Sequence, residues 1–235
     1  VFGMPSRISE IKVIADSWGI PLVEDAAESL GSWIKQGSEL KHSGLFGDVS
    51  IFSFNGNKII TTGGGGALIT NDSGLAKQAK HLSTTAKLDH PWEFNHDQLG
   101  WNDRLPNINA ALGVAQMEVL NNRINLKRNL YKKYITFFSE IDGVEIVKES
   151  PESISNNWLI SLRFTDDDCF RAGIKRTKLL QTAHSKGLLL RPVWNLLNKQ
   201  KMYQKCPAGN LKVAENECLR IINLPSSPNL FKENI

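Results

Sequence analysis

The spacing of apolar residues at the start of the chain predicts a helix followed by a strand. Apolar residues recur at helical spacing over residues 6–18, and Ser6 is the predicted N-cap of this helix. The apolar run at 20–23 then predicts a buried strand that ends in Glu24 and Asp25. This order is typical of a parallel α/β sheet, in which ligands gather at the carboxyl ends of the strands.

The next hundred residues continue with strands, a helix and a loop. Apolar runs at 49–54 and 67–70 predict two further strands. The glycine-rich segment 61–66 between them allows a sharp turn or a close approach of the backbone to a ligand. The polar residues 71–73 predict the cap of a helix that runs to about residue 82. The polar and aromatic segment 87–102 has no clear period, which predicts a long loop.

The second half of the chain begins with the longest helical pattern, over 107–139, with a break near residues 121–122. We place a domain boundary after it, so that the predicted domains are 1–140 and 141–235. The elements expected after the boundary are strands at 144–147 and 158–164, a helix over 170–186, a strand at 188–190, a helix over 211–219 and an apolar segment at 221–224.

Composition narrows the class of protein. Of 235 residues, 41% are hydrophobic and 22% charged, so the chain can bury a core and is not disordered. The net charge of +4 does not by itself indicate binding to nucleic acid or to a membrane, and no apolar run approaches the roughly 20 residues of a membrane span. Three cysteines without a CxxC spacing argue against a disulfide framework or a cysteine-rich zinc site and favour a cytoplasmic location.

Two ionisable residues stand at predicted strand ends. Lys58 follows the strand at 49–54 and precedes two isoleucines. A desolvated lysine loses its charge more easily and can form a Schiff base, whereas the alternative is a surface lysine in a loop. Asp25 is either a carboxylate directed at a cationic ring nitrogen or the cap of a helix over 26–28. Both alternatives stay open for each residue taken alone.

Asp25, Ser53 and Lys58 taken together indicate a particular cofactor more specifically than any one of them does alone. Pyridoxal phosphate needs a lysine, an acid that keeps its ring nitrogen protonated, and hydroxyl or backbone N–H groups for its phosphate. Asp25, Ser53 and Lys58 supply the acid, the hydroxyl and the amine in that order along the chain. The sequence therefore predicts a pyridoxal phosphate site.

Three segments resemble the DegT/DnrJ/EryC1/StrS family of sugar aminotransferases: VEDAAESLGS at 23–32, GDVSIFSFNGNKIITTGGGGALITND at 47–72 and GWNDRLPNINAALGVAQ at 100–116. A LegC-like subgroup is suggested by three segments: FNGNKIITTGGGG, HPWEF at 90–94 and LRPVW at 190–194. The resemblance implies an α/β fold, the type I fold of PLP-dependent transferases. Its parts would be the C-terminal portion of a large PLP-binding domain with a mostly parallel sheet, followed by a smaller C-terminal α+β domain.

The resemblance also implies residue roles around the cofactor. Lys58 would hold pyridoxal phosphate as a Schiff base and later move a proton, and Asp25 would pair with the pyridinium nitrogen. Ala27 would pack under the ring, and Ser53 would donate a hydrogen bond to the phosphate. Glu28 stands where many family members have a glutamine that touches the ring hydroxyl, so its carboxylate adds negative charge near the cofactor.

Further roles concern the substrate and a second subunit. Asn102, with Arg104 close by, would reach the phosphate in a neighbouring subunit, which implies a homodimer with shared active sites. His90 or Trp92 would line a nucleotide-sugar pocket, and the alternative for Trp92 is structural packing. Arg191 would bind either an anionic substrate or a structural acid.

The expected reaction is transfer of an amino group from glutamate to a UDP-linked 4-keto-6-deoxy amino sugar, in cell-surface polysaccharide biosynthesis. The chain starts at Val1, and family members have well over a hundred residues before this point. We therefore expect a fragment with little activity of its own. The alternatives are a truncated or non-catalytic homologue that folds and dimerises, and a phosphate-binding α/β module, although GxGxxG and GxxxxGK[ST] are absent.

The remaining groups of residues can be explained without a further functional site. His90, His96 and Asp97 lack a second cluster, so we predict no metal site. The apolar stripe within 111–120 predicts either core packing or a dimer interface. Four basic residues on the long helix predict a solvated face, with attraction of a diphosphate substrate as the alternative: Lys127, Arg128, Lys132 and Lys133.

Overall fold

The computed structural model describes residues 1–231, which form two compact units. The first unit consists mainly of Gly3–Ile124 with Ser150–Asn156, and the second mainly of Asn125–Glu149 and the residues from Asn157 onward. The division falls within helix α4 (Leu120–Phe138), because this helix belongs to the first unit at its start and to the second thereafter. The predicted domains 1–140 and 141–235 divide the chain later and stay a prediction; residues 232–235 lie outside the described part.

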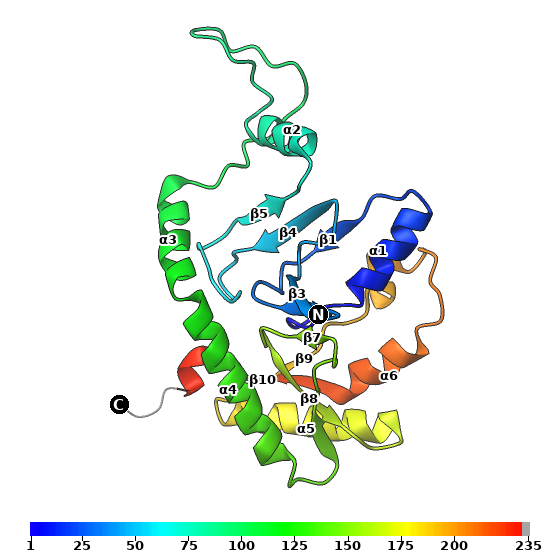
Figure 1. Ribbon diagram of the computed structural model, residues 1–235. Coiled ribbons are helices and arrows are strands. Elements are labelled where there is room, and N and C mark those ends of the chain that lie inside the picture. Colours follow the sequence, from blue (N-terminus) through cyan, green and yellow to red (C-terminus); the bar gives the residue numbers. More distant parts are fainter. Residues whose placement is uncertain (232–235) are drawn as a thin grey trace. The chain divides into compact units, whose positions relative to one another are not determined.

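A three-stranded sheet organises the first unit (Figure 1), with the order β1 (Val23–Asp25), β4 (Val49–Ser53) and β5 (Gly66–Ile69). β1 runs parallel to β4, whereas β5 runs antiparallel to it. The predicted mostly parallel sheet thus has one parallel and one antiparallel pairing in the described residues. The connection from β4 to β5 contains no helix, and a parallel return would need a long crossover. The strand expected at 20–23 begins three residues later.

The helices of the first unit are α1 (Ile8–Ser17), α2 (Ser73–Ser83) and α3 (Asn107–Glu118). The prediction of Ser6 as the cap of α1 was wrong, since Arg7 occupies the N-cap position and makes no side-chain capping bond. The capping of α2 is confirmed. Its N-cap, Asp72, accepts hydrogen bonds from the amides of Gly74, at 2.7 Å, and Leu75, at 3.0 Å.

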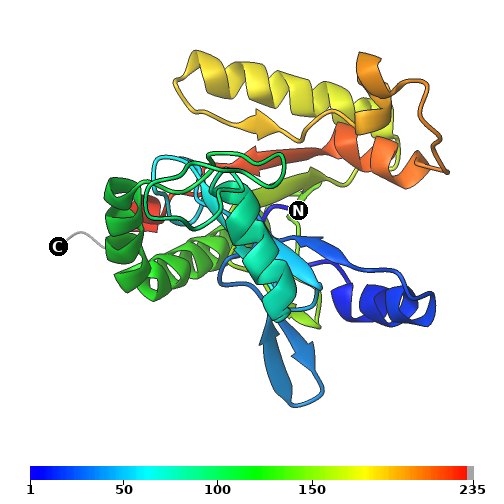
Figure 2. The same cartoon turned by 90° about the horizontal axis from the view of Figure 1, so that it is seen from above.

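A short antiparallel hairpin was not predicted from the sequence. It consists of β2 (Trp33–Gln36) and β3 (Glu39–His42), and β7 (Ser153–Ile154) joins it in the order β3-β2-β7. The hairpin is visible in blue in Figure 2. Its strands are short and mostly exposed, so they carry little of the alternating apolar pattern on which strand prediction depends.

The second unit contains a four-stranded antiparallel sheet with the order β6-β8-β10-β9. The predicted strands and helices after residue 140 are confirmed within a few residues, except that the strand expected at 188–190 lies at 191–192. The elements are β6 (Val144–Ile146), β8 (Ile160–Phe164), α5 (Cys169–Ser185), β9 (Arg191–Pro192), α6 (Lys212–Arg220), β10 (Ile221–Leu224) and the 3₁₀ turns Leu197–Lys199, Lys201–Tyr203 and Pro228–Phe231. No helix within residues 1–231 is both long and apolar enough to cross a bilayer.

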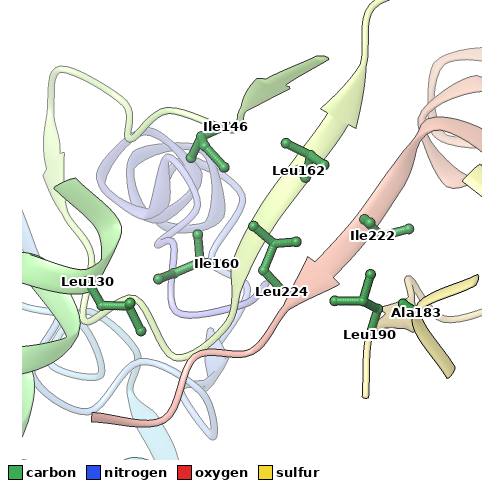
Figure 3. Close-up of a cluster of buried hydrophobic side chains, with 8 residues drawn as sticks. All are labelled: Leu130, Ile146, Ile160, Leu162, Ala183, Leu190, Ile222 and Leu224. Carbon is green, nitrogen blue, oxygen red and sulfur yellow. The ribbon is translucent and has the colours of Figure 1, made fainter. Parts of the chain in front are cut away.

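A cluster of aliphatic side chains forms the core of the second unit (Figure 3). The central strands β8 and β10 contribute most of it, since Ile160, Leu162 and Ile222 are almost fully buried. The cluster comprises Leu130, Ile146, Ile160, Leu162, Ala183, Leu190, Ile222 and Leu224. Its members come from α4, three strands, α5 and the segment before β9, so this core connects most elements of the unit.

Lys127 departs from the predicted solvated basic face. Its side chain on α4 is only 5% exposed. Its ammonium donates hydrogen bonds to the carbonyl oxygens of Trp158, at 3.1 Å, and Ser226. Burial lowers the pKa of Lys127 from 10.5 to about 8, because a poorly solvated site disfavours the charged form. The prediction that Lys127 is solvated was therefore wrong.

This buried amine makes stability depend on pH. The folded chain releases the Lys127 proton near pH 8, whereas the unfolded chain keeps it until about pH 10.5, so the unfolded state binds more protons between these values. Lys127 is expected to contribute a rise of about 3 kcal/mol to the free energy of unfolding across this window. Urea denaturation of the wild type at pH 7.5–10.5 measures this rise. Lys127→Met should lose this pH dependence, and Lys132→Met should keep it; equal slopes in all three proteins would contradict the assignment.

Candidate active site

Two of the predicted site residues lie at the carboxyl ends of the parallel strands β1 and β4. Asp25 is in register with Ile51, and Ser53 follows two residues later on β4. Because side chains alternate along a strand, Asp25 and Ser53 face the same side of the sheet. Asp25 is exposed, and its carboxylate accepts a hydrogen bond from the Ala27 amide at 3.1 Å. No helix follows, so the interpretation of Asp25 as a helix cap was wrong; the bond stabilises a turn.

Lys58 lies in the segment after β4, and its side chain is only 14% exposed. The two residues that follow it, Ile59 and Ile60, are buried. Its Nζ lies 3.8 Å from Oε1 of Glu28, so an amine and a carboxylate from different segments meet here. This partial burial is less exposure than an ordinary surface lysine in a loop would have. Its role toward a cofactor stays a prediction.

The turn that carries Ala27 and Glu28 is held by a residue distant in sequence. The side-chain amide of Asn156 donates hydrogen bonds to the carbonyl oxygens of Glu28, at 2.8 Å, and Leu30, at 2.9 Å. Asn156 is fully buried and belongs to the same unit as the turn. The sequence offered no sign of this contact, because 128 residues separate the two partners.

Part of the glycine-rich segment packs against β4. A Cβ atom at Gly66 would overlap the carbonyl oxygen of Phe52, so only glycine allows the two backbones to approach this closely. The Phe54 amide donates to the Gly65 carbonyl oxygen at 2.9 Å, and the Asn109 side chain donates to the Thr62 carbonyl oxygen at 2.6 Å. These contacts hold the segment that follows Lys58.

Residues 87–102 form the predicted long loop, without a named helix or strand. The His90 ring lies edge-on to Trp92, with 5.0 Å between ring centroids, and its Nδ1 accepts a hydrogen bond from the Glu93 amide at 3.0 Å. Trp92 is well exposed. A role of these two rings in a nucleotide-sugar pocket stays a prediction.

The remaining predicted residues are exposed. Asn102 forms an isolated β-bridge with Thr84, and the Arg104 guanidinium donates to the Ser83 hydroxyl at 3.4 Å. Arg191 begins β9 in the second unit, in register with Asn223 of β10. The roles given to Asn102, Arg104 and Arg191 stay predictions.

His81 of α2 and His96 of the loop make structural contacts. His81 Nε2 lies 2.7 Å from Oδ1 of Asp97, and this hydrogen bond lowers the pKa of Asp97. His96 Nδ1 lies 2.7 Å from the Thr85 carbonyl oxygen. Within residues 1–231 no group of three or more histidine, cysteine or acidic side chains is arranged to hold a metal ion.

Comparison with known proteins identifies the family. The sequence model of the DegT/DnrJ/EryC1/StrS aminotransferase family matches residues 1–235, and the chain belongs to this family. It is 35% identical over 242 residues to GDP-perosamine synthase of Escherichia coli O157:H7, covering all of this chain and 61% of the relative. It is also 35% identical over 239 residues to EpsN of Bacillus subtilis (strain 168), provisionally named a pyridoxal phosphate-dependent aminotransferase, covering 99% of this chain and 58% of EpsN.

Solved structures show the same fold. The aminotransferase TlmJ from Streptoalloteichus hindustanus superposes with a TM-score of 0.88 at 24% identity, over 98% of this chain and 60% of TlmJ. PseC from Helicobacter pylori gives 0.87 at 24% identity, over 97% of this chain and 60% of PseC. The family and the α/β fold class predicted from the sequence are confirmed. The chain spans about three fifths of the length of these relatives.

Proposed function

We propose that this chain carries the lysine-bearing part of a pyridoxal phosphate-dependent aminotransferase that acts on nucleotide-linked keto sugars. The observation that carries the proposal is the partly buried amine of Lys58, 3.8 Å from the Glu28 carboxylate, in the same unit as Asp25 and Ser53. Membership of the aminotransferase family supports it, as do relatives named GDP-perosamine synthase and dTDP-4-amino-4,6-dideoxy-D-glucose transaminase.

The available groups match what pyridoxal phosphate requires. Bound cofactor supplies an aldehyde that reacts with amines and a ring that withdraws electrons from the substrate carbon. Lys58 offers the amine, Asp25 offers a carboxylate for the ring nitrogen, and Ser53 offers a hydroxyl for the phosphate. Asp25 and Ser53 share one face of the sheet at the edge where such ligands gather. Glu28 would accept a hydrogen bond from the ring hydroxyl.

The residues then have distinct tasks. Lys58 Nζ would hold the cofactor covalently through its aldehyde until an amino donor takes its place, and the freed amine would accept and return a proton as a general base and acid. The ion pair with Glu28 orients Lys58, and the buried isoleucines after it limit access of water. The Asp25 carboxylate favours the protonated ring nitrogen by its opposite charge. Ala27, in the turn after β1, is proposed to pack under the ring.

The finer assignments belong to the same proposal. We propose glutamate as the amino donor and a UDP-linked 4-keto-6-deoxy amino sugar as the acceptor, in cytoplasmic synthesis of cell-surface polysaccharides. The named relatives use GDP- and dTDP-linked sugars, so the nucleotide is the first property to test. His90, Trp92 and Arg191 are the proposed substrate contacts.

A homodimer is also part of the proposal, with Asn102 and Arg104 reaching into the neighbouring subunit. Helix α3 supports this, because it buries none of its residues and leaves Val114 64% exposed. Within the described residues, the predicted stripe in 111–120 does not pack into a core along α3. We propose that a second copy of the chain covers it.

The test combines trapping of the cofactor with nitrogen transfer. Chain 1–235 is incubated with pyridoxal phosphate and reduced with borohydride, and the labelled peptide is mapped by mass spectrometry. We expect the label on Lys58. Transfer from ¹⁵N-glutamate is then measured with UDP-, GDP- and dTDP-linked 4-keto sugars, and turnover by 1–235 alone is expected to be low. Label on other lysines but not on Lys58 would contradict the proposal, whereas label on Lys58 without any transfer would favour the non-catalytic homologue.

A further inference from the structure

Glu24 is a buried acid directly before Asp25 in strand β1, with 7% of its surface exposed. Its two carboxylate oxygens accept hydrogen bonds from three backbone amides and two hydroxyl groups of the segment 43–50. The donors are the amides of Gly44 (2.7 Å), Phe46 (3.1 Å) and Gly47 (3.3 Å) and the hydroxyls of Ser43 (3.3 Å) and Ser50 (3.4 Å). A carboxylate so completely surrounded by donors is compensated for its loss of water.

The segment around this carboxylate is shaped to fit it. Gly44 has a φ of +90°, and a Cβ atom there would overlap the Phe52 ring and lie 3.2 Å from Cβ of Ala26. Only glycine therefore lets the backbone turn its amide toward Glu24 so close to β1 and β4. The network is thus a built feature of the first unit.

The network extends to the turn of the candidate site. The single proton of the Ser43 hydroxyl is shared between Glu24, at 3.3 Å, and the Ser29 hydroxyl, at 2.9 Å, and the Ser29 hydroxyl donates to the Ala26 carbonyl oxygen at 3.2 Å. This turn also carries Glu28, whose carboxylate lies 3.8 Å from Lys58. A chain of hydrogen bonds therefore connects Glu24 with the segment that meets Lys58.

Strand geometry connects Glu24 with Asp25 as well. Burial alternates along β1, with Glu24 buried between exposed Val23 and exposed Asp25. Neighbouring residues in a strand face opposite sides, and a slip by one residue would reverse every side chain. The five donors that hold Glu24 inside therefore keep the Asp25 carboxylate on the side of Ser53.

We propose that Glu24 is a positioning residue for cofactor binding. It holds Asp25 in place through the register of β1, and it holds the Glu28 turn beside Lys58 through Ser43 and Ser29. A well-packed apolar side chain would fill a buried position at less cost in desolvation, which is consistent with a role beyond packing. The inference rests on the proposed function, since it concerns the same cofactor.

Glu24→Gln tests the inference with almost no change of shape. The amide nitrogen of glutamine would face backbone N–H donors, so at least one of the bonds to Gly44, Phe46 or Gly47 is lost. We expect cofactor trapping at Lys58, under limiting pyridoxal phosphate, to fall about tenfold. We also expect the yellow absorbance of the bound cofactor to change its pH dependence in the same direction as in Asp25→Asn.

The control is Leu162→Ala, which destabilises the second unit and leaves the Glu24 network intact. It should trap cofactor in proportion to its folded fraction and keep the wild-type pH dependence. If Glu24→Gln behaves like this control or like the wild type, the inference is overturned. Should Glu24→Gln not fold, Ser43→Ala removes the connection to Ser29, and about threefold weaker trapping is expected; unchanged trapping overturns the inference. Absence of label at Lys58 in the wild type would instead refute the proposed function.

Discussion

Replacing Lys58 by alanine is expected to abolish covalent trapping of pyridoxal phosphate at this position and to lower amino transfer by about 10³-fold. The physical reason is the loss of the amine that is proposed to bind the aldehyde and move the proton. Glu28, 3.8 Å away, is an acid and cannot take over these roles of an amine. The measurements are mass spectrometry of the borohydride-reduced protein and transfer of ¹⁵N from glutamate to the keto sugar.

Two control variants separate the amine from its charge. Lys58→Arg keeps a cation beside Glu28, but the guanidinium stays protonated and cannot act as the nucleophile. It should therefore lose trapping as completely as Lys58→Ala. Lys77→Ala, at an exposed position of α2, should behave like the wild type. Covalent trapping that survives in Lys58→Ala, on the same peptide, would refute the assignment.

Replacing Ile222 by alanine is expected to lower the free energy of unfolding of the second unit by about 4 kcal/mol. Ile222 is fully buried on β10, where it is in register with Leu162 of β8 and Pro192 of β9. The change removes three carbon atoms from a close-packed cluster that connects most elements of the unit. Urea denaturation followed by circular dichroism measures the loss.

Graded controls make the prediction for Ile222 specific. Ile222→Val removes one methylene group and should cost about 1 kcal/mol. Ile174→Ala changes the same residue type on α5, where the side chain is 57% exposed, and should cost less than about 0.5 kcal/mol. Equal losses for Ile222→Ala and Ile174→Ala would show that the cluster in Figure 3 does not carry the stability of the unit.

Elements with local signals were predictable. The cap of α2 needs only Asp72 and the amides of Gly74 and Leu75, and β4 is an apolar run long enough to be recognised alone. The long loop at 87–102 was visible as a loss of period. The break between α3 and α4 falls at Val119, close to the expected position, because helix ends depend on neighbouring residues.

Elements that depend on distant partners were not predictable in the same way. The antiparallel direction of β5 follows from its pairing with β4, and the hairpin of β2 and β3 is completed by β7 more than a hundred residues later. Ser6 failed as a cap because a capping bond depends on the local backbone geometry, which residue type alone does not determine. Pairing of strands is decided by which surfaces become buried together, and a linear pattern does not contain that information.

The sequence by itself determined the family and the order of Asp25, Ser53 and Lys58 along the chain, because residue type and spacing suffice to recognise the family and to predict a cofactor-binding role. Only the tertiary structure decided that Glu28 lies beside Lys58 and that Glu24 and Lys127 are buried. From the sequence alone, a charged side chain is expected to be exposed to solvent. Whether it is buried depends on hydrogen-bond donors and acceptors that folding brings from distant segments to compensate for lost water.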